Sequence, residues 1–153
     1  MIPIGDLQFT SKTPIEKGWS ADRKYCVTDA AGTRYLLRIS AAEQYARKES
    51  QYALLQRVAA LGIPMCRPVA FGMGEDGVYT LQSWIDGEDA EVVLPRCTAT
   101  QQYALGQQAG EILRQIHTIP APADTEAWEV RFNRKIDRKL KMYAECELKY
   151  DNG

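Results

Sequence analysis

The sequence has little of what would place it in several common protein classes. It has one histidine and four widely spaced cysteines with no CxxC pair, so a zinc site of the usual ligand spacing is not indicated. No apolar run approaches the roughly 20 residues that a membrane helix needs. The first residues lack the basic and apolar regions of a signal peptide. We therefore expect reduced thiols, a cytoplasmic location and no membrane partner.

Strong charge of one sign is also lacking. The formal net charge is −1, which gives no overall field that would attract nucleic acid or an anionic membrane surface. The remaining composition is that of an ordinary globular protein, with 45% hydrophobic and 25% charged residues among 153. Such a chain can bury a hydrophobic core of its own. We expect no nucleic-acid partner.

The first half of the chain has the pattern of short strands. Alternation of apolar and polar residues and the flanking turn residues predict five of them, over residues 9–17, 24–29, 34–39, 69–71 and 78–82. Asp29-Ala30-Ala31-Gly32 is predicted to be a hairpin turn, and Gly74-Glu75-Asp76-Gly77 a turn that leads into the strand at 78–82. Between the third and fourth strands, a capping box at Ser40–Glu43 predicts a helix that ends near Leu61, before Gly62-Ile63-Pro64.

The second half is predicted to be helical. Thr98–Gln101 matches another capping box, and the helix that follows is expected to end before Pro120. Helical spacing of apolar residues then predicts a last helix over about 125–149. The fold class is therefore α+β, with a mainly antiparallel sheet of about five strands and one helix across it. We expect a first lobe over 1–82, a linker over 83–98 and helices over 99–153 that begin a second lobe.

Two charges lie where a charge is costly. Arg38 interrupts the apolar run 35–39, and Glu49 is predicted on the apolar side of the following helix. A buried ion is tolerated when it is paired or used. If Tyr35, Leu37 and Ile39 pack on the helix side, Leu36 and Arg38 face a cleft, where they would meet a base and its phosphates. The alternative is an exposed Arg38 with Glu49 paired to a neighbour on its own helix.

A glycine turn, Gly18-Trp19-Ser20, lies between two predicted strands and upstream of Arg38. A turn of this kind lets backbone N–H groups approach phosphate oxygens. It has neither the Walker pattern nor the full GxGxxG. An ordinary hairpin turn with glycine at positive φ is the other interpretation.

The order of these pieces resembles the N-terminal lobe of the aminoglycoside phosphotransferase/choline kinase group, within the protein-kinase-like fold. The similarity covers roughly residues 9–119. The segments that carry it are Lys17-Gly18-Trp19-Ser20, Tyr35-Leu36-Leu37-Arg38-Ile39-Ser40, Lys48-Glu49 with Ala59-Ala60-Leu61-Gly62-Ile63-Pro64, Leu81-Gln82-Ser83-Trp84-Ile85-Asp86-Gly87, and Gly110-Glu111-Ile112-Leu113-Arg114-Gln115-Ile116-His117.

The resemblance implies a nucleotide site for ATP or GTP with Mg²⁺. In it, Arg38 would bind phosphates and Glu49 would orient Arg38. Arginine suits this position because it is always charged and binds phosphate through two hydrogen bonds. The other cofactor-binding residues implied are Gly18, Trp19 and Ser20 in the phosphate-covering turn, Leu36 on the strand, Gln82 at the back of the pocket, and Ser83 and Ile85 on the hinge that binds the base.

The chain also departs from the family. The family's catalytic loop reads HxDxxxxN, and no Asp of this chain has Asn five positions further on. We therefore expect no catalytic or metal-binding residue here, and we expect the chain to be the front part of a longer enzyme that phosphorylates a small-molecule hydroxyl. Candidate acceptors are an aminoglycoside, with antibiotic resistance as the consequence, choline, a sugar or an amino alcohol.

Two other interpretations remain open. The chain could be a non-catalytic nucleotide-binding or protein-interaction module, or a lobe of a protein kinase. If the chain is part of a longer enzyme, its C-terminal helices are left with a bare apolar surface, and we expect self-association through residues 101–150.

Overall fold

The computed structural model describes residues 2–147. Residues 148–153 lie outside the described part, and with them the last residues of the helix predicted over 125–149. The chain divides into two compact units, one ending at Ile119 and the other beginning at Pro120, and each is described by itself. The predicted limit at 98/99 coincides with the start of helix α3, and the limit at 82/83 falls one residue before the end of strand β7. The domain assignment itself stays a prediction.

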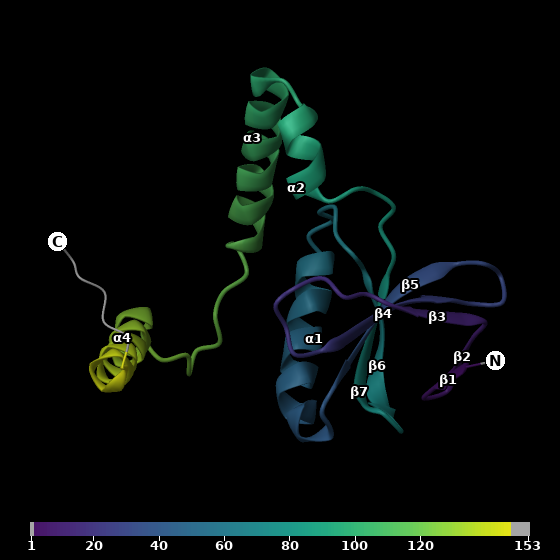
Figure 1. Cartoon of the computed structure of the whole chain (residues 1–153), viewed down its shortest axis with the longest axis horizontal. Helices are drawn as coiled ribbons and strands as arrows, with labels where there is room; N and C mark the ends of the chain where they lie inside the picture. Colours follow the sequence, from purple (N-terminus) through teal and green to yellow (C-terminus); the bar gives the residue numbers. More distant parts are fainter. Residues whose placement is uncertain (1, 148–153) are drawn as a thin grey trace. The chain divides into compact units, whose positions relative to one another are not determined.

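The first unit is built on a five-stranded antiparallel sheet (Figure 1). In spatial order the strands are β3 (Ser11–Pro14), β4 (Arg23–Thr28), β5 (Arg34–Ser40), β7 (Gly77–Ser83) and β6 (Pro68–Gly74). Both predicted turns are present, and their glycines Gly32 and Gly77 have φ angles of 83° and 121°, which favour a residue without Cβ. The predicted α+β class and the five-stranded antiparallel sheet are confirmed.

A separate two-stranded hairpin was not predicted. It pairs β1 (Ile2–Ile4) with β2 (Leu7–Phe9) in antiparallel register. Of the strand predicted over 9–17, only β3 (Ser11–Pro14) is present, and Phe9 instead ends β2, because the chain changes sheets at Thr10. The Thr10 hydroxyl donates to the backbone carbonyls of Thr28 and Asp29 at 3.0 and 3.1 Å, and this fixes the crossing point.

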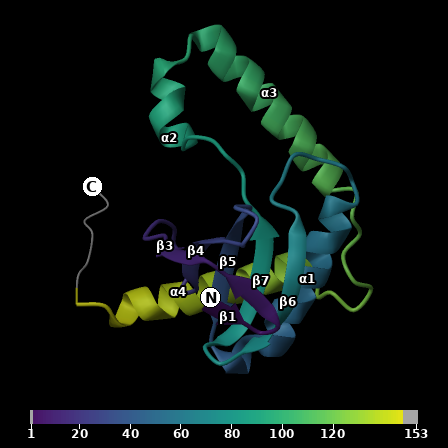
Figure 2. The same cartoon turned by 90° about the vertical axis from the view of Figure 1, so that its right-hand side faces the viewer.

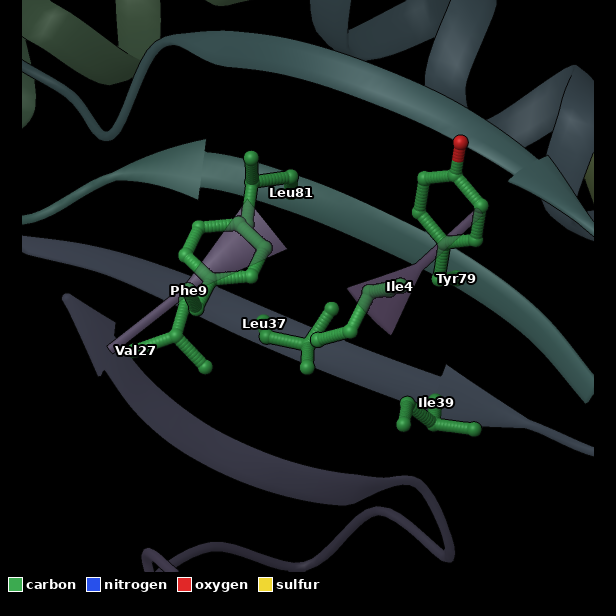
Figure 3. Close-up of a cluster of buried hydrophobic side chains, with 7 residues drawn as sticks. All are labelled: Ile4, Phe9, Val27, Leu37, Ile39, Tyr79 and Leu81. Atoms are coloured by element: carbon green, nitrogen blue, oxygen red, sulfur yellow. The ribbon is translucent and has the colours of Figure 1, made fainter. Parts of the chain in front are cut away.

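One face of the five-stranded sheet packs with this hairpin to form the core. Figure 3 shows the buried side chains, which are Ile4, Phe9, Val27, Leu37, Ile39, Tyr79 and Leu81. Because side chains alternate along a strand, Leu36 and Arg38 point to the opposite face. The condition considered from the sequence, that Leu37 and Ile39 pack on the helix side, is therefore not met: they pack toward the hairpin, and Arg38 lies on the helix side.

Helix α1 (Tyr45–Ala59) lies on the other side of the sheet from the hairpin (Figures 1 and 2). The rings of Tyr45 and Tyr52 contact the Phe71 ring of β6, with centroids 5.2 and 5.3 Å apart. A short 3-10 turn, η1 (Ala42–Gln44), precedes α1.

The capping box predicted at Ser40–Glu43 is wrong. Ser40 is the last residue of β5, and the N-cap of η1 is Ala41, which makes no side-chain cap. The Ser40 hydroxyl instead donates to Asp22, at 2.9 Å. A polar residue at the end of a strand can match a capping pattern while its side chain serves another partner.

The helices after the sheet are α2 (Ala90–Val93), η2 (Leu94–Arg96), α3 (Ala99–Ile116) and, in the second unit, α4 (Trp128–Glu145). The capping box that opens α3 is confirmed, with the amide of Gln101 donating to the Thr98 hydroxyl and the Gln101 side chain accepting from the Thr98 amide. None of the described helices has an apolar stretch long enough to cross a lipid bilayer.

Candidate functional site

The Asp22 carboxylate is the centre of a compact polar cluster between the sheet and α1. Lys48 of α1 donates to both carboxylate oxygens at 2.8 Å. Arg38 of β5 donates to Oδ2 through Nε at 3.2 Å and through Nη2 at 2.8 Å, and Ser40 donates to Oδ1. The side chains of Asp22 and Lys48 are only 7% and 13% exposed. One buried carboxylate therefore binds two cations, which leaves a net charge of about +1 on the group of three.

The protonation of Asp22 follows from these contacts. Burial by itself would raise its pKa, because it disfavours the charged form. Hydrogen bonds from Lys48, Ser40 and Arg38 outweigh burial and hold the pKa of Asp22 below its ordinary value of 3.8. The carboxylate is therefore ionised at neutral pH and keeps both cations in place.

Arg38 is the member of this group that still faces solvent. Its side chain is 35% exposed, and Nη2 also donates to the Ser20 hydroxyl at 3.2 Å. Within residues 2–147 no hydrogen bond is made by its Nη1. Since the Ser20 oxygen accepts from Arg38, the Ser20 hydroxyl hydrogen is left to donate to a ligand. Arg38 and Ser20 thus present adjacent donors at the edge of the cluster.

A small cavity of about 70 Å³ adjoins the cluster on the α1 side of the sheet. Its lining combines the three charged residues with polar and apolar neighbours, namely Asp22, Arg38, Lys48, Gln51, Tyr52, Leu55, Thr80 and Gln82. Gln82, predicted to guard the back of the pocket, is buried with 7% exposure. The predicted residues Arg38 and Gln82 are brought to one cavity.

Glu49 was predicted on the apolar side of α1, and this prediction is wrong, because the Glu49 side chain is exposed. Arg38 pairs with Asp22 at 2.8 Å in place of the expected pairing with Glu49. The helix turn explains the difference. Lys48 and Leu55 are seven residues apart and face the sheet together, whereas Glu49 is rotated away from them by one residue, about 100°. An inward carboxylate is present near Arg38, but it comes from the residue before β4.

The glycine turn at residues 18–20 has glycine at positive φ, which is compatible with both interpretations given from the sequence. Gly18 has a φ of 99°, and a Cβ there would lie 3.0 Å from the Nζ of Lys24. Lys24 donates to the carbonyl of Lys17, which closes the turn. The Trp19 ring is fully exposed at its tip. Glycine is therefore favoured at position 18 by its φ angle, whereas the Lys24 ammonium, at the end of a flexible side chain, could move aside for a Cβ.

The remaining predicted residues lie near the end of the central strands. Leu36 pairs in register with Gln82, and Tyr35 with Ser83. The backbone N–H of Ser83 donates to the carbonyl of Arg67 at 2.8 Å, so a contact to a base would have to use the Ser83 carbonyl. Ile85 is 55% exposed beyond the end of β7. Their role in binding stays a prediction.

The sequence interpretation missed Asp22 and Lys48. Asp22 follows the glycine turn directly, and nothing local indicates that it is buried. Lys48 could have been found from the C-terminal part of its helix, because Tyr52 and Leu55 are half-buried and lie four and seven residues after it on the same face. Within residues 2–147, no group of three or more His, Cys, Asp or Glu side chains is placed to hold a metal ion.

Stability should depend on pH through Asp22. The Asp22 carboxyl has a lower pKa in the folded state than in the unfolded state, so its ionised form stabilises the fold at any pH above the ordinary pKa. This contribution is lost as the pH falls through the pKa of the folded state. We expect the free energy of unfolding to hold near neutral pH and to fall below about pH 4. Urea unfolding from about pH 7 to about pH 3 tests this. Because Asn does not titrate, Asp22→Asn should flatten the acid part of the curve; an unchanged acid slope would contradict the assignment.

Comparison with known proteins gives the class. The chain belongs to the phosphotransferase enzyme family, whose sequence model matches residues 12–152. The predicted family resemblance is thereby confirmed. A comparison with curated proteins finds no match.

The solved structures to which the chain is similar include two of the Mycobacterium tuberculosis PknI kinase domain. For a cysteine-to-alanine variant of that domain the TM-score is 0.48 at 15% identity, covering 77% of this chain and 53% of the kinase domain. For the unmodified domain the TM-score is 0.46 at 17% identity, covering 76% and 51%. The chain thus spans about half the length of these domains.

Proposed function

We propose that this chain binds the nucleotide for a phosphotransferase that moves the γ-phosphate of ATP or GTP to a hydroxyl group of a small molecule. Family membership supports the class of reaction. The observation that carries the proposal is Arg38, a cation on a central strand that is held by a buried carboxylate and still partly exposed. A cation fixed in this way is suited to a polyanionic ligand, because its orientation is set before binding.

The phosphates would bind at the edge of the Asp22 cluster. Nη1 of Arg38 makes no hydrogen bond within residues 2–147 and can donate to a phosphate, and the adjacent Ser20 hydroxyl can add another hydrogen bond. Backbone N–H groups of the turn that contains Gly18 would approach the same phosphates. Trp19, at the tip of this turn, would cover the ligand from the solvent side.

The base would lie along the ends of the central strands. Leu36 offers an apolar surface, and Gln82 lies at the back of the cavity described above. The carbonyl of Ser83 and the backbone around Ile85 would meet the polar edge of the base, with the Ser83 N–H already used within the protein.

The acceptor and the metal are proposed from family membership. Candidate acceptors are an aminoglycoside, choline or a sugar, and antibiotic resistance would follow only from the first. Mg²⁺ would accompany the nucleotide. The sequence contains no HxDxxxxN, so we propose that this chain alone binds nucleotide without transferring phosphate. A cytoplasmic location, where ATP is abundant, fits this role.

The test is calorimetric titration with ATP and Mg²⁺. Arg38→Ala should weaken binding by about 1.5–3 kcal/mol, which is the usual contribution of a hydrogen bond to a charged group. Arg23→Ala is the matched control, since Arg23 is on the neighbouring strand and its guanidinium donates to the Asp76 carbonyl at 2.8 Å. Equal affinity for the wild type and Arg38→Ala, with measurable binding in both, would rule out Arg38 as the phosphate ligand.

Self-association through the C-terminal helices stays a prediction. Helix α4 has an apolar stripe at helical spacing, and its members Trp128, Phe132, Ile136, Leu140 and Tyr143 are between 39% and 63% exposed within the described residues. A stripe of this length is typical of a surface that packs against another protein segment.

A further inference from the structure

We propose that Asp22 and Lys48 together are the positioning pair for Arg38, in the role that the resemblance assigns to Glu49. The inference rests on the proposed nucleotide site and adds residues to it. Neither Asp22 nor Lys48 is expected to touch the nucleotide. Their effect would be exerted through the orientation of Arg38 and through the net charge of the Asp22–Arg38–Lys48 cluster.

The contacts of Asp22 support a positioning role. Its two oxygens accept hydrogen bonds from Arg38, Ser40 and Lys48, all between 2.8 and 3.2 Å. A carboxylate has about four acceptor sites, so these donors occupy it fully. With 7% of its side chain exposed, Asp22 has little capacity left for a ligand. It can hold Arg38 in one orientation, with Nε and Nη2 turned inward.

Lys48 balances the negative charge of Asp22. An isolated Arg38–Asp22 pair would be neutral and would attract phosphate weakly. Lys48 binds the same carboxylate and is 13% exposed, so it compensates the charge of Asp22 from the protein side. The group keeps a net charge of about +1, and Arg38 is the member with solvent access. Lys48 thereby leaves the charge of Arg38 available to an anionic ligand.

The placement of the three residues on the fold makes the arrangement rigid. Arg38 is on the central strand β5, which pairs with β4 on one side and β7 on the other. Asp22 directly precedes β4, and Lys48 is in the first turn of α1. The cluster thus joins the glycine turn, the sheet and the helix at one point. A ligand that binds Arg38 would meet a cation whose position is set by three elements.

The decisive variant is Asp22→Asn, because a positioning role predicts weaker binding of ATP, whereas the change in net charge alone predicts tighter binding. Removing the carboxylate charge raises the net charge of the cluster, and charge alone would tighten binding of ATP. If Asp22 positions Arg38, affinity for ATP with Mg²⁺ falls by about tenfold. Affinity for adenosine, which has no phosphate, should stay unchanged and would show that the site is folded. Unchanged or tighter binding of ATP would overturn the proposal.

Lys48→Ala provides the second arm, with Arg47→Ala as its matched control. Both variants remove one positive charge from neighbouring positions of α1, but Arg47 is exposed. We expect Lys48→Ala to weaken ATP binding by about tenfold and to spare adenosine, while Arg47→Ala changes neither. If both variants weaken ATP binding equally, the effect is one of general charge, and the proposal is wrong for Lys48.

Glu49→Gln separates this proposal from the family expectation. If Glu49→Gln weakens ATP binding and Asp22→Asn does not, Glu49 is the orienting carboxylate and the proposal fails while the proposed function stands. If the folded wild type binds neither ATP nor adenosine, the proposed function fails, and this inference falls with it. Asp76→Asn, a carboxylate that pairs with Lys12 and Arg23, serves as the control and should change nothing.

Discussion

Replacing Asp22 by alanine is expected to lower the free energy of unfolding by about 3 kcal/mol, the lower end of the range for breaking a buried ion pair. The substitution leaves Arg38 and Lys48 side by side without their common carboxylate, and Lys48 is 13% exposed. Arg38 is 35% exposed, so solvent screens part of its charge and keeps the loss from being larger. Urea unfolding at neutral pH measures the change.

Asp76→Ala is the control for that measurement. Asp76 also faces two cations, Lys12 at 3.5 Å and Arg23 at 3.9 Å, but its side chain is 57% exposed. Exposed pairs contribute less than about 1 kcal/mol. If the two variants lose the same free energy, burial does not decide the contribution of Asp22 and the cluster is not a structural centre.

Replacing Leu37 by alanine is expected to cost about 3–4 kcal/mol of stability. Leu37 is fully buried in the core between the sheet and the β1–β2 hairpin. Removing its side chain loses the transfer free energy of the buried carbons and leaves a cavity that rigid strands on both sides cannot close. Chemical denaturation with the wild type as reference measures the loss.

Leu36→Ala is the matched control, because it makes the same chemical change on the same strand. Leu36 is half-buried on the opposite face of the sheet, and we expect a loss of about 1 kcal/mol, in proportion to the smaller buried area. A larger loss at Leu36 than at Leu37 would mean that the core lies on the α1 side, against the packing described above.

The fold could be predicted from the sequence where the signal is local. Alternation along residues 34–40 and the glycines at the two hairpin turns are properties of single strands and single turns. The α3 capping box, Thr98 with Gln101, is likewise a contact within one turn. Each of these patterns has one dominant physical cause, and the structure agrees with all of them.

What could not be predicted depends on contacts between distant segments. Asp22 binds Arg38 and Lys48 across 16 and 26 residues, and no pattern near Asp22 signals this. The capping box predicted at Ser40 is wrong for the same reason, since the Ser40 hydroxyl donates to Asp22 and does not cap the helix that follows. Which of the neighbours Lys48 and Glu49 faces inward depends on the rotation of α1, and this is set by its packing on the sheet.

The alternation of the two sheet faces also bears on how such a site can change during evolution. On β7, the core residues Tyr79 and Leu81 alternate with Thr80 and Gln82, which line the small cavity. A substitution at Thr80 or Gln82 alters the cavity without displacing a core side chain, because neighbours on a strand point to opposite faces. The shape and polarity of the cavity can therefore change by single substitutions on one face while the other face keeps the fold stable.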